Sequence, residues 1–403
     1  MLGPFDLNLR HIDAVLAVAR EGSVSAASGA VNLSQPALTQ ALTKLEILLD
    51  QRLFDRLPGG TVPTPAGATF IARAARALDH LVAGGRRIRR AARLPQIAYI
   101  ERRVTMGQLR ALSSVERSGS YVMAARELRL AQPSVHRAVK ELELILGQNL
   151  LVRVGRTVRA TAAAVRFVRS IRLMVAELQA GLDELAALVR AGTGRVVVGT
   201  LPLPRARLLP EALALLMSAY EQAEVTIVEG SYTELLMALR GGEIDILVGA
   251  LRDPAPSSDV VQRPLLDDDL FVVGRADHPL AGDEVPTLEA LASFPWIVGA
   301  SGAPMRAVWE TMFAARRPAR RIECGSVLTA RGLMLRGEWL ALLSSDQFRV
   351  ERDAGLLAAV AGPVPGSRRR IGIALRADWR PTAIQSALID ALTAAAQPDT
   401  SGI

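Results

Sequence analysis

The chain has 403 residues, of which 50% are apolar and 22% charged, so it can form two to four domains with substantial cores. This composition excludes collagen, coiled-coil rods and extensive disorder, and the single cysteine, Cys324, excludes an intramolecular disulfide and a cysteine-based zinc site. The charged N-terminus and the lack of any apolar run of about 18 residues predict a cytoplasmic protein with no membrane partner.

The net charge of +8 is unevenly distributed. Residues 1–193 contain 27 Lys and Arg against 15 Asp and Glu, whereas residues 194–403 contain 21 against 25. A basic first half joined to a mildly acidic second half indicates that the first half binds a polyanion. The alternative is a solvated surface with a chance asymmetry.

The basic half contains an internal repeat at an offset of 97 residues. The segments that begin at Leu9 and Met106 align without a gap, and the identical pairs include Gly22/Gly119, Gln35/Gln132, Pro36/Pro133, Glu46/Glu143 and Arg56/Arg153. We infer a duplicated module, which we call copy one and copy two.

Each copy is predicted to form three short helices and a hairpin. The first helix ends at Gly22 or Gly119, and the second covers residues 26–31 or 123–128. The third begins at Ser34 in copy one, because serine is a good N-cap and Pro36 is tolerated in the first turn.

The third helix is predicted to bury its leucines and to expose a polar face. That face carries Ser34, Gln35, Pro36, Thr39, Gln40 and Thr43 in copy one, and Gln132, Ser134, His136, Arg137 and Lys140 in copy two. The hairpin behind it adds Arg56 in copy one and Arg153, Arg156 and Arg159 in copy two, which suit phosphate contacts. A short polar helix supported by a second helix and a basic wing is typical of major-groove reading. The alternative is a helical bundle whose polar face is only solvated.

The pattern of residues 26–56, followed by Pro63-Thr64-Pro65-Ala66-Gly67, resembles the N-terminal winged helix-turn-helix of LysR-type transcriptional regulators. Copy two resembles it as well, but Ala131 replaces the capping serine and the ending is reduced to Thr161-Ala162-Ala163-Ala164. Residues 1–67 carry a net charge of −1 and residues 101–162 carry +6. We therefore expect copy two to provide more of the non-specific, salt-dependent DNA affinity.

A connecting segment follows each copy. After copy one, the predicted helix ends at Gly84-Gly85. An arginine cluster follows (residues 86–93), which either contacts DNA phosphates or is a solvated linker. After copy two, residues 163–191 carry a heptad seam, formed by Val168, Ile171, Val175, Leu178, Leu182, Leu185 and Val189. The resemblance implies that this helix joins two chains, so that a dimer would carry four modules on a palindromic operator. The alternative is a helix packed on its own effector domain.

From Arg195 onward, short apolar runs alternate with helical segments, which predicts α/β units with largely parallel sheets. Crossovers near 260–268 and 362–370 would divide this half into two subdomains with a cleft between them. The segments EGSYTELLMALRGGEIDILVGALR (229–252), ADHPLAG (276–282) and LALLSSDQ (340–347) resemble the effector-binding domain of LysR regulators, most closely the branch that regulates sugar-binding-protein operons.

The resemblance implies a small-molecule coinducer, a sugar or a small organic acid, bound at the carboxyl ends of the strands. The candidate contacts are Thr200, Leu201, Arg205, Tyr232, Gly249, Ser301, Gly302, Arg306 and Ser326. The alternative is an ordinary turn or cap residue, which a loop Ser or Gly at a strand end more often is. The four histidines are scattered, and no nucleophile elbow or phosphate loop is present, so we expect no enzyme, metal or cofactor.

The predicted fold is mixed α and α/β: two tandem winged helix-turn-helix domains, a long dimerisation helix and a two-subdomain effector domain resembling periplasmic binding proteins. The expected domains are 1–67, 68–100, 101–162, 163–193 and 194–403, the last split into subdomain I (194–264 and 366–398) and subdomain II (265–365). The expected function is a ligand-responsive transcription regulator that binds double-stranded DNA as a homodimer or homotetramer, with RNA polymerase as a further candidate partner. The alternatives are an architectural DNA-binding protein without a ligand, and a solute-binding or catalytic protein localised by its modules.

Overall fold

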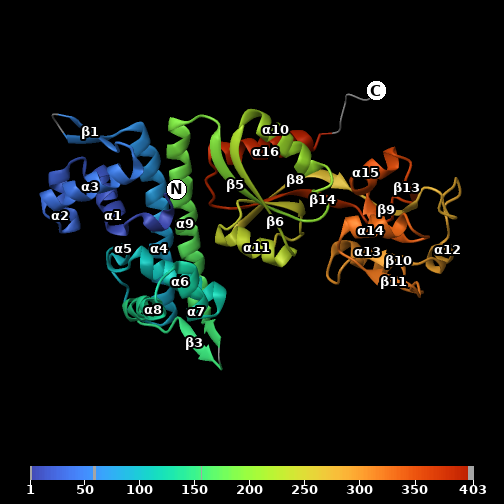
Figure 1. Ribbon diagram of the computed structural model, residues 1–403, viewed down its shortest axis with the longest axis horizontal. Helices are drawn as coiled ribbons and strands as arrows, with labels where there is room; N and C mark the ends of the chain where they lie inside the picture. Colours follow the sequence, from blue (N-terminus) through green and yellow to red (C-terminus); the bar gives the residue numbers. More distant parts are fainter. Residues whose placement is uncertain (1, 58–59, 156, 398–403) are drawn as a thin grey trace. The chain divides into compact units, whose positions relative to one another are not determined.

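The computed structural model describes residues 2–57, 60–155 and 157–397, and the contacts within the chain divide it into two compact units, with the main division at Arg195. The N-terminal unit is largely helical, and the C-terminal unit is built on two β-sheets (Figure 1).

The two copies fold into the same sequence of elements. Copy one has η1 (Pro4–Asp6), α1 (Leu9–Glu21), α2 (Val24–Val31), α3 (Gln35–Leu49), β1 (Phe54–Leu57) and β2 (Gly60–Pro63). Copy two has α5 (Ile100–Arg103), α6 (Met106–Ser118), α7 (Tyr121–Leu128), α8 (Gln132–Leu146), β3 (Leu151–Val154) and β4 (Thr157–Ala160). Gly22 and Gly119 end the first helices in the left-handed conformation, which glycine adopts without steric cost. Pro58, Gly59 and Arg156 lie outside the described residues.

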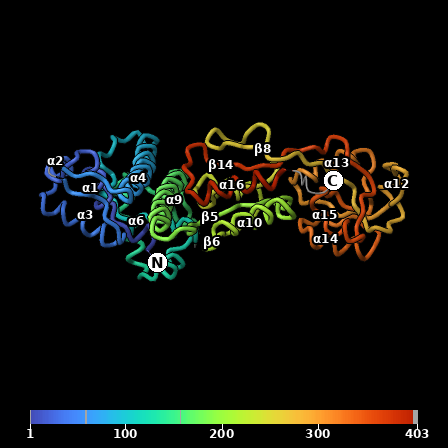
Figure 2. The backbone as a smooth tube through the Cα atoms, turned by 90° about the horizontal axis from the view of Figure 1, so that it is seen from above, coloured from blue at the N-terminus to red at the C-terminus, as the bar shows by residue number. Residues whose placement is uncertain are grey.

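A long helix follows each copy: α4 (Pro65–Ala91) and α9 (Ala162–Val189). The two helices lie side by side (Figures 1 and 2). The predicted break at Gly84-Gly85 is wrong, because α4 continues through both glycines. Both are buried, and a Cβ built on Gly84 would lie 2.6 Å from the Ser170 Cβ, so close packing against α9 outweighs the weak helix propensity of glycine.

The heptad seam of α9 packs inside the chain. Val168, Ile171, Leu178 and Leu185 are buried in a core that also contains Phe70, Ala74, Ala77, Leu78 and Leu81 of α4. Val175 and Leu182 are half-buried against the same core, whereas Val189 is 73% exposed. The predicted seam between two chains is therefore occupied by the chain's own α4, which supplies the apolar partner that the heptads require.

The C-terminal unit has two five-stranded sheets. The first has the order β6-β5-β7-β14-β8, from β5 (Thr193–Thr200), β6 (Gln222–Glu229), β7 (Ile246–Ala250), β8 (Val260–Asp268) and β14 (Arg369–Arg376). The second has the order β11-β10-β12-β9-β13, from β9 (Leu270–Arg275), β10 (Trp296–Val298), β11 (Arg321–Glu323), β12 (Leu340–Ser344) and β13 (Leu357–Ala361).

Both sheets are mixed, so the prediction of largely parallel sheets is wrong. Strand β14 runs antiparallel to β7 and β8, and β9 runs antiparallel to β12 and β13. The crossovers predicted near 260–268 and 362–370 lie where the chain passes between the two sheets, from β8 to β9 and from β13 to β14. Residues 260–268 also form the edge strand β8, which was not predicted as a strand.

The sheets are accompanied by seven helices in the described residues. They are α10 (Leu208–Ala219), α11 (Tyr232–Gly241), α12 (Leu288–Ser293), α13 (Pro304–Met312), α14 (Val327–Met334), α15 (Ser345–Asp353) and α16 (Ala383–Ala395). Two ion pairs join the subdomains: Arg207 to Asp346 at 2.9 Å and Arg349 to Glu211 at 3.3 Å.

Candidate functional site

The third helix of copy one has one buried and one exposed side. Leu38, Leu42 and Leu45 are buried, and the Ser34 hydroxyl accepts the backbone N–H of Ala37 at 3.4 Å, as an N-cap does. The opposite side carries the predicted reading residues: Gln35, Pro36, Gln40 and Thr43 are exposed and Thr39 is half-buried. Arg56 is exposed on β1. The structure therefore leaves the predicted DNA-contact residues of copy one accessible, with Thr39 only half-buried.

Copy two presents an equivalent surface with a different charge. Gln132, Ser134, His136, Arg137 and Lys140 are exposed on α8, and Arg153 and Arg159 are exposed on the hairpin. The predicted contact Arg156 lies outside the described residues. Ala131 provides no side-chain cap. The copy-two surface is consequently more basic, but its third helix, α8, lacks the side-chain cap that Ser34 provides in copy one.

Two polar residues of copy two have partners within the protein. Lys140 forms an ion pair with Glu143 at 2.6 Å, and the His136 ring lies 5.1 Å from the ring of Tyr121. Burial and the charge of Glu143 raise the pKa of Tyr121 to about 12, so its hydroxyl stays neutral. Arg137 is the exposed cation on α8 for which no internal ion pair is seen in the described part of the chain.

One glutamate in each copy fixes the third helix to the hairpin, a role the sequence did not reveal. The Glu46 carboxylate accepts the backbone N–H of Leu53 at 2.8 Å, and Glu143 accepts that of Leu150 at 2.7 Å. The 97-residue offset relates these pairs. The signal available in the sequence was that Glu46 and Glu143 are the same residue at equivalent positions of the two copies, since an acidic residue beside the predicted DNA-contact face needs an internal partner.

The predicted effector residues of the first sheet gather at the carboxyl ends of β5 and β7. Thr200 is fully buried, the Leu201 N–H donates to Val248 O at 3.0 Å, and a Cβ on Gly249 would lie 2.5 Å from Leu201. Glycine at 249 therefore makes room for the Leu201 side chain, which would have to shift if a larger residue stood there.

Two further candidates lie near this sheet. Arg205 forms an ion pair with Glu229. The Arg252 guanidinium lies 4.5 Å from the centre of the Tyr232 ring, and burial raises the pKa of Tyr232 although Arg252 opposes that effect. The Tyr232 hydroxyl is buried and has no hydrogen-bond partner among the described residues. Sequence reasoning missed Arg252, which follows β7 without a distinguishing motif.

The candidates of the second sheet lie around Glu323, which sequence reasoning also missed. The Ser301 N–H donates to Glu323 at 3.4 Å, and Arg306 approaches the same carboxylate at 3.5 Å while pairing with Glu310 at 2.8 Å. Gly302 has a φ of +79°, and Ser326 caps α14 through the N–H of Thr329. Both candidate arginines, Arg205 and Arg306, thus already have carboxylate partners.

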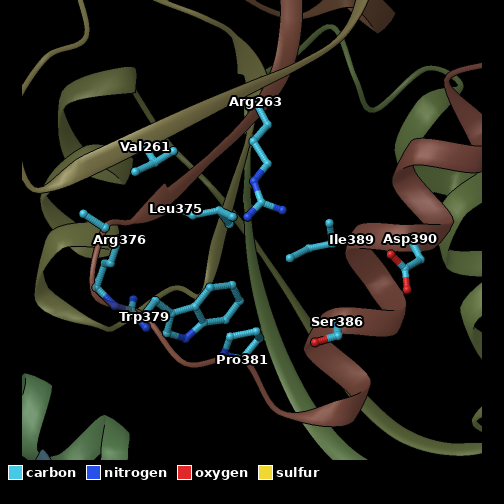
Figure 3. A pocket seen from close by; sticks show the side chains of 10 residues that line it. Val261, Arg263, Leu375, Arg376, Trp379, Pro381, Ser386, Ile389 and Asp390 are labelled. Atoms are coloured by element: carbon cyan, nitrogen blue, oxygen red, sulfur yellow. The ribbon is translucent and has the colours of Figure 1, made fainter.

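A hollow of about 240 Å³ lies elsewhere, beside β8, β14 and α16 (Figure 3). Its lining includes Arg263, Trp379, Ser386 and Asp390, and none of the predicted effector residues. It is smaller than the roughly 300–1,000 Å³ typical of small-molecule sites, so it does not replace the predicted effector position.

Within the described ranges, no group of three or more His, Cys, Asp or Glu side chains is arranged to hold a metal. Nor does any helix of the described chain have the length and apolarity needed to cross a bilayer.

Comparison with known families and proteins agrees with this arrangement. The family "LysR substrate binding domain" matches residues 190–397, and "Bacterial regulatory helix-turn-helix protein, lysR family" matches residues 9–68 and 106–165. The chain is 32% identical over 376 residues to the "HTH-type transcriptional regulator GalR" of Pseudomonas putida, covering 92% of each protein. It is 27% identical to the regulator PcaQ of Agrobacterium fabrum, covering 96% of that protein and 74% of this chain.

Solved structures share the fold. A full-length OxyR variant from Pseudomonas aeruginosa matches with a TM-score of 0.54 at 23% identity, covering 73% of this chain and 94% of that one. CbnR complexed with its target DNA matches with a TM-score of 0.51 at 20% identity, covering 72% and 98%. The match of a family model to more than half of the chain, and a relative above 30% identity over nearly its whole length, decide the assignment. The chain belongs to the LysR family of ligand-responsive, DNA-binding transcriptional regulators.

Proposed function

We propose that both winged modules of this regulator read DNA, each through the exposed side of its third helix. The observation that supports this is the repetition of one design: a buried leucine side, an exposed polar side and a hairpin tied to the helix by Glu46 or Glu143. The third helix of copy one offers uncharged polar side chains suited to base edges, and copy two adds Arg137, Arg153 and Arg159 for phosphates.

Footprinting of the upstream intergenic DNA across a salt series tests this proposal. The paired changes Gln35→Ala with Thr39→Ala, and Gln132→Ala with Arg137→Ala, should each remove part of the protected sequence. Arg316→Ala is a charge-matched control, because this side chain is 77% exposed in the C-terminal unit. If one paired variant retains the complete footprint, its copy does not read DNA. If the parent protein shows no sequence-selective protection, the architectural alternative is supported instead.

We propose further that the C-terminal unit binds a small, largely uncharged polar molecule, such as a sugar, at the carboxyl ends of the two sheets. The buried, unpartnered Tyr232 hydroxyl supports a polar ligand, and the carboxylate pairing of Arg205 and Arg306 disfavours an anion, which would have to displace Glu229 or Glu323.

Thermal unfolding monitored by tryptophan fluorescence tests this, with a monosaccharide panel and a panel of small carboxylates as probes. A monosaccharide should raise the Tm. Tyr232→Phe and Ser301→Ala should weaken its binding, so that a concentration about tenfold higher is needed for the same Tm shift, which is the loss expected for one or two hydrogen bonds. Ser218→Ala, an exposed change on α10, is the control. A response to carboxylates alone would overturn the choice of a neutral ligand.

A further inference from the structure

The pairing of α4 with α9 is antiparallel. Gly84, late in α4, faces Phe167 and Ser170, early in α9, whereas Arg73, early in α4, faces Glu177 and Glu184. The two helices also share one apolar core with both DNA-binding modules.

The contacts between α4 and α9 stay equivalent when copy one and copy two are interchanged. A Cβ on Gly84 would lie 2.6 Å from the Ser170 Cβ and 3.2 Å from the Phe167 ring. A Cβ on Gly181 would lie 3.1 Å from the Arg73 Cβ and 3.8 Å from the Phe70 ring. At the 97-residue offset of the repeat, Gly84 is equivalent to Gly181, Arg73 to Ser170 and Phe70 to Phe167. Each copy therefore contacts the other through equivalent positions, as the two partners of an isologous interface do.

The same exchange relates contacts between the modules. Arg102 of copy two forms an ion pair with Asp13 of copy one at 2.7 Å. The equivalent positions are Phe5 and Arg110, and the Arg110 guanidinium lies 5.6 Å from the centre of the Phe5 ring. The short helix η1 likewise contacts α6 and α9, and its counterpart α5 contacts α1 and α4. A pseudo-two-fold axis thus relates the whole of copy one to the whole of copy two, including the reading helices α3 and α8.

Buried charges favour this pairing over a pairing of identical helices. Arg73 is 1% exposed and contacts Glu177 at 3.0 Å and Glu184 through a second, shorter ion pair. The positions equivalent to these two glutamates are His80 and Arg87. Two α4 helices in the same register would place Arg73 against a histidine and an arginine. Two α9 helices would place Ser170 against two glutamates. Both arrangements lose the compensated charges, so the unlike pair is specified.

We propose that a single chain is the complete two-fold reading unit, and that its two modules occupy the two half-sites of one inverted repeat in DNA. Two-fold related reading helices require inverted half-sites. Because Gln40 and Thr43 of copy one correspond to Arg137 and Lys140 of copy two, the half-sites differ in sequence, and the operator is an imperfect palindrome. This inference rests on the proposed function, since it presupposes that both modules bind DNA.

Stoichiometric titration tests the number of chains per repeat. A fluorescently labelled duplex containing one footprinted inverted repeat is titrated with the full-length protein, at DNA concentrations far above Kd. The expected end point is one chain per duplex. The same end point is expected if chains associate through other surfaces, because each chain of such an oligomer binds a duplex of its own. An end point of two chains per duplex would assign one half-site to each chain and overturn the proposal.

Complementation identifies whether the modules act in the same chain. The variants Gln35→Ala/Thr39→Ala and Gln132→Ala/Arg137→Ala are co-expressed and assayed on the same duplex. When each chain pairs its own copies, every chain retains one defective reader, so high-affinity binding is not restored. Restored binding would show that copy one of one chain pairs with copy two of another, and would overturn the proposal.

A cysteine crosslink tests the pairing of α4 with α9 in the absence of DNA. Its result therefore does not depend on whether the modules bind DNA as proposed. Gly84→Cys and Ser170→Cys are combined with Cys324→Ser, which removes the native thiol. The helices must part by about an ångström to accommodate a disulfide. We expect oxidation to give a crosslinked single chain on a non-reducing gel. A covalent dimer, or thiols that stay free, would overturn the proposal. The titration with unaltered protein is the check should this variant misfold.

Discussion

Replacing Arg73 with methionine should strongly destabilise the N-terminal unit. The Arg73 side chain is 1% exposed, and its removal leaves the carboxylates of Glu177 and Glu184, whose side chains are 8% and 16% exposed, without this partner. Burial opposes the charge on Arg73, but hydrogen bonds and charges from Glu184 and Glu177 outweigh it and raise its pKa. Removing one member of such a buried group costs about 3–5 kcal/mol.

For a unit of this size the loss corresponds to a Tm decrease of roughly 6–20 °C. The assay can separate the units, because all four tryptophans (Trp296, Trp309, Trp339 and Trp379) lie in the C-terminal unit. Far-UV circular dichroism should show an earlier loss of helix, while the tryptophan transition stays in place. Adding Glu177→Gln and Glu184→Gln should recover much of the stability, since neutral side chains no longer leave unpaired charges.

The exposed ion pair Arg117–Glu127 provides the matched control. Its side chains are 63% and 43% exposed, so Arg117→Met should cost less than about 1 kcal/mol. A loss for Arg73→Met as small as that of the control would refute the reasoning, because the buried charges would then contribute nothing particular to the pairing of α4 with α9.

Three further predictions follow from other parts of the chain. Ala131→Ser should stabilise copy two by about 0.5–2 kcal/mol in urea unfolding, as it restores the cap that Ser34 provides in copy one; no change would mean that the cap geometry is lost there. Arg137→Ala should reduce the slope of log affinity against log salt by about 0.9, the contribution of one phosphate contact, and an unchanged slope would place Arg137 away from the backbone. His278 is buried and its pKa is lowered by that burial, so the unfolded chain binds its proton more readily. Stability of the C-terminal unit should therefore fall as the pH drops below about 6.5, by up to about 1.4 kcal/mol per pH unit, and His278→Gln should flatten this dependence in fluorescence-monitored unfolding.

The sequence alone determined the features that local signals encode. The repeat, the helix ends at Gly22 and Gly119, the buried leucines of α3 and most strands of the C-terminal unit were predictable from capping, periodicity and apolar runs. The family assignment and the regulatory function followed from the same segments and were confirmed by comparison. The repeat was found from self-similarity at an offset of 97 residues, and the other predictions succeeded because each depends on residues that are close together in the sequence.

Only the tertiary structure decided what the long helices pack against. The heptads of α9 require an apolar partner, but periodicity does not identify the helix that supplies it. Arg73 and Glu177 are about a hundred residues apart, so their pairing leaves no local signal. The two glycines of α4 suggested a break because glycine is a poor helix former, yet at Gly84 the missing side chain allows α9 to approach. Complementarity between distant segments, in shape and in buried charge, thus turned a predicted interface between chains into one within the chain.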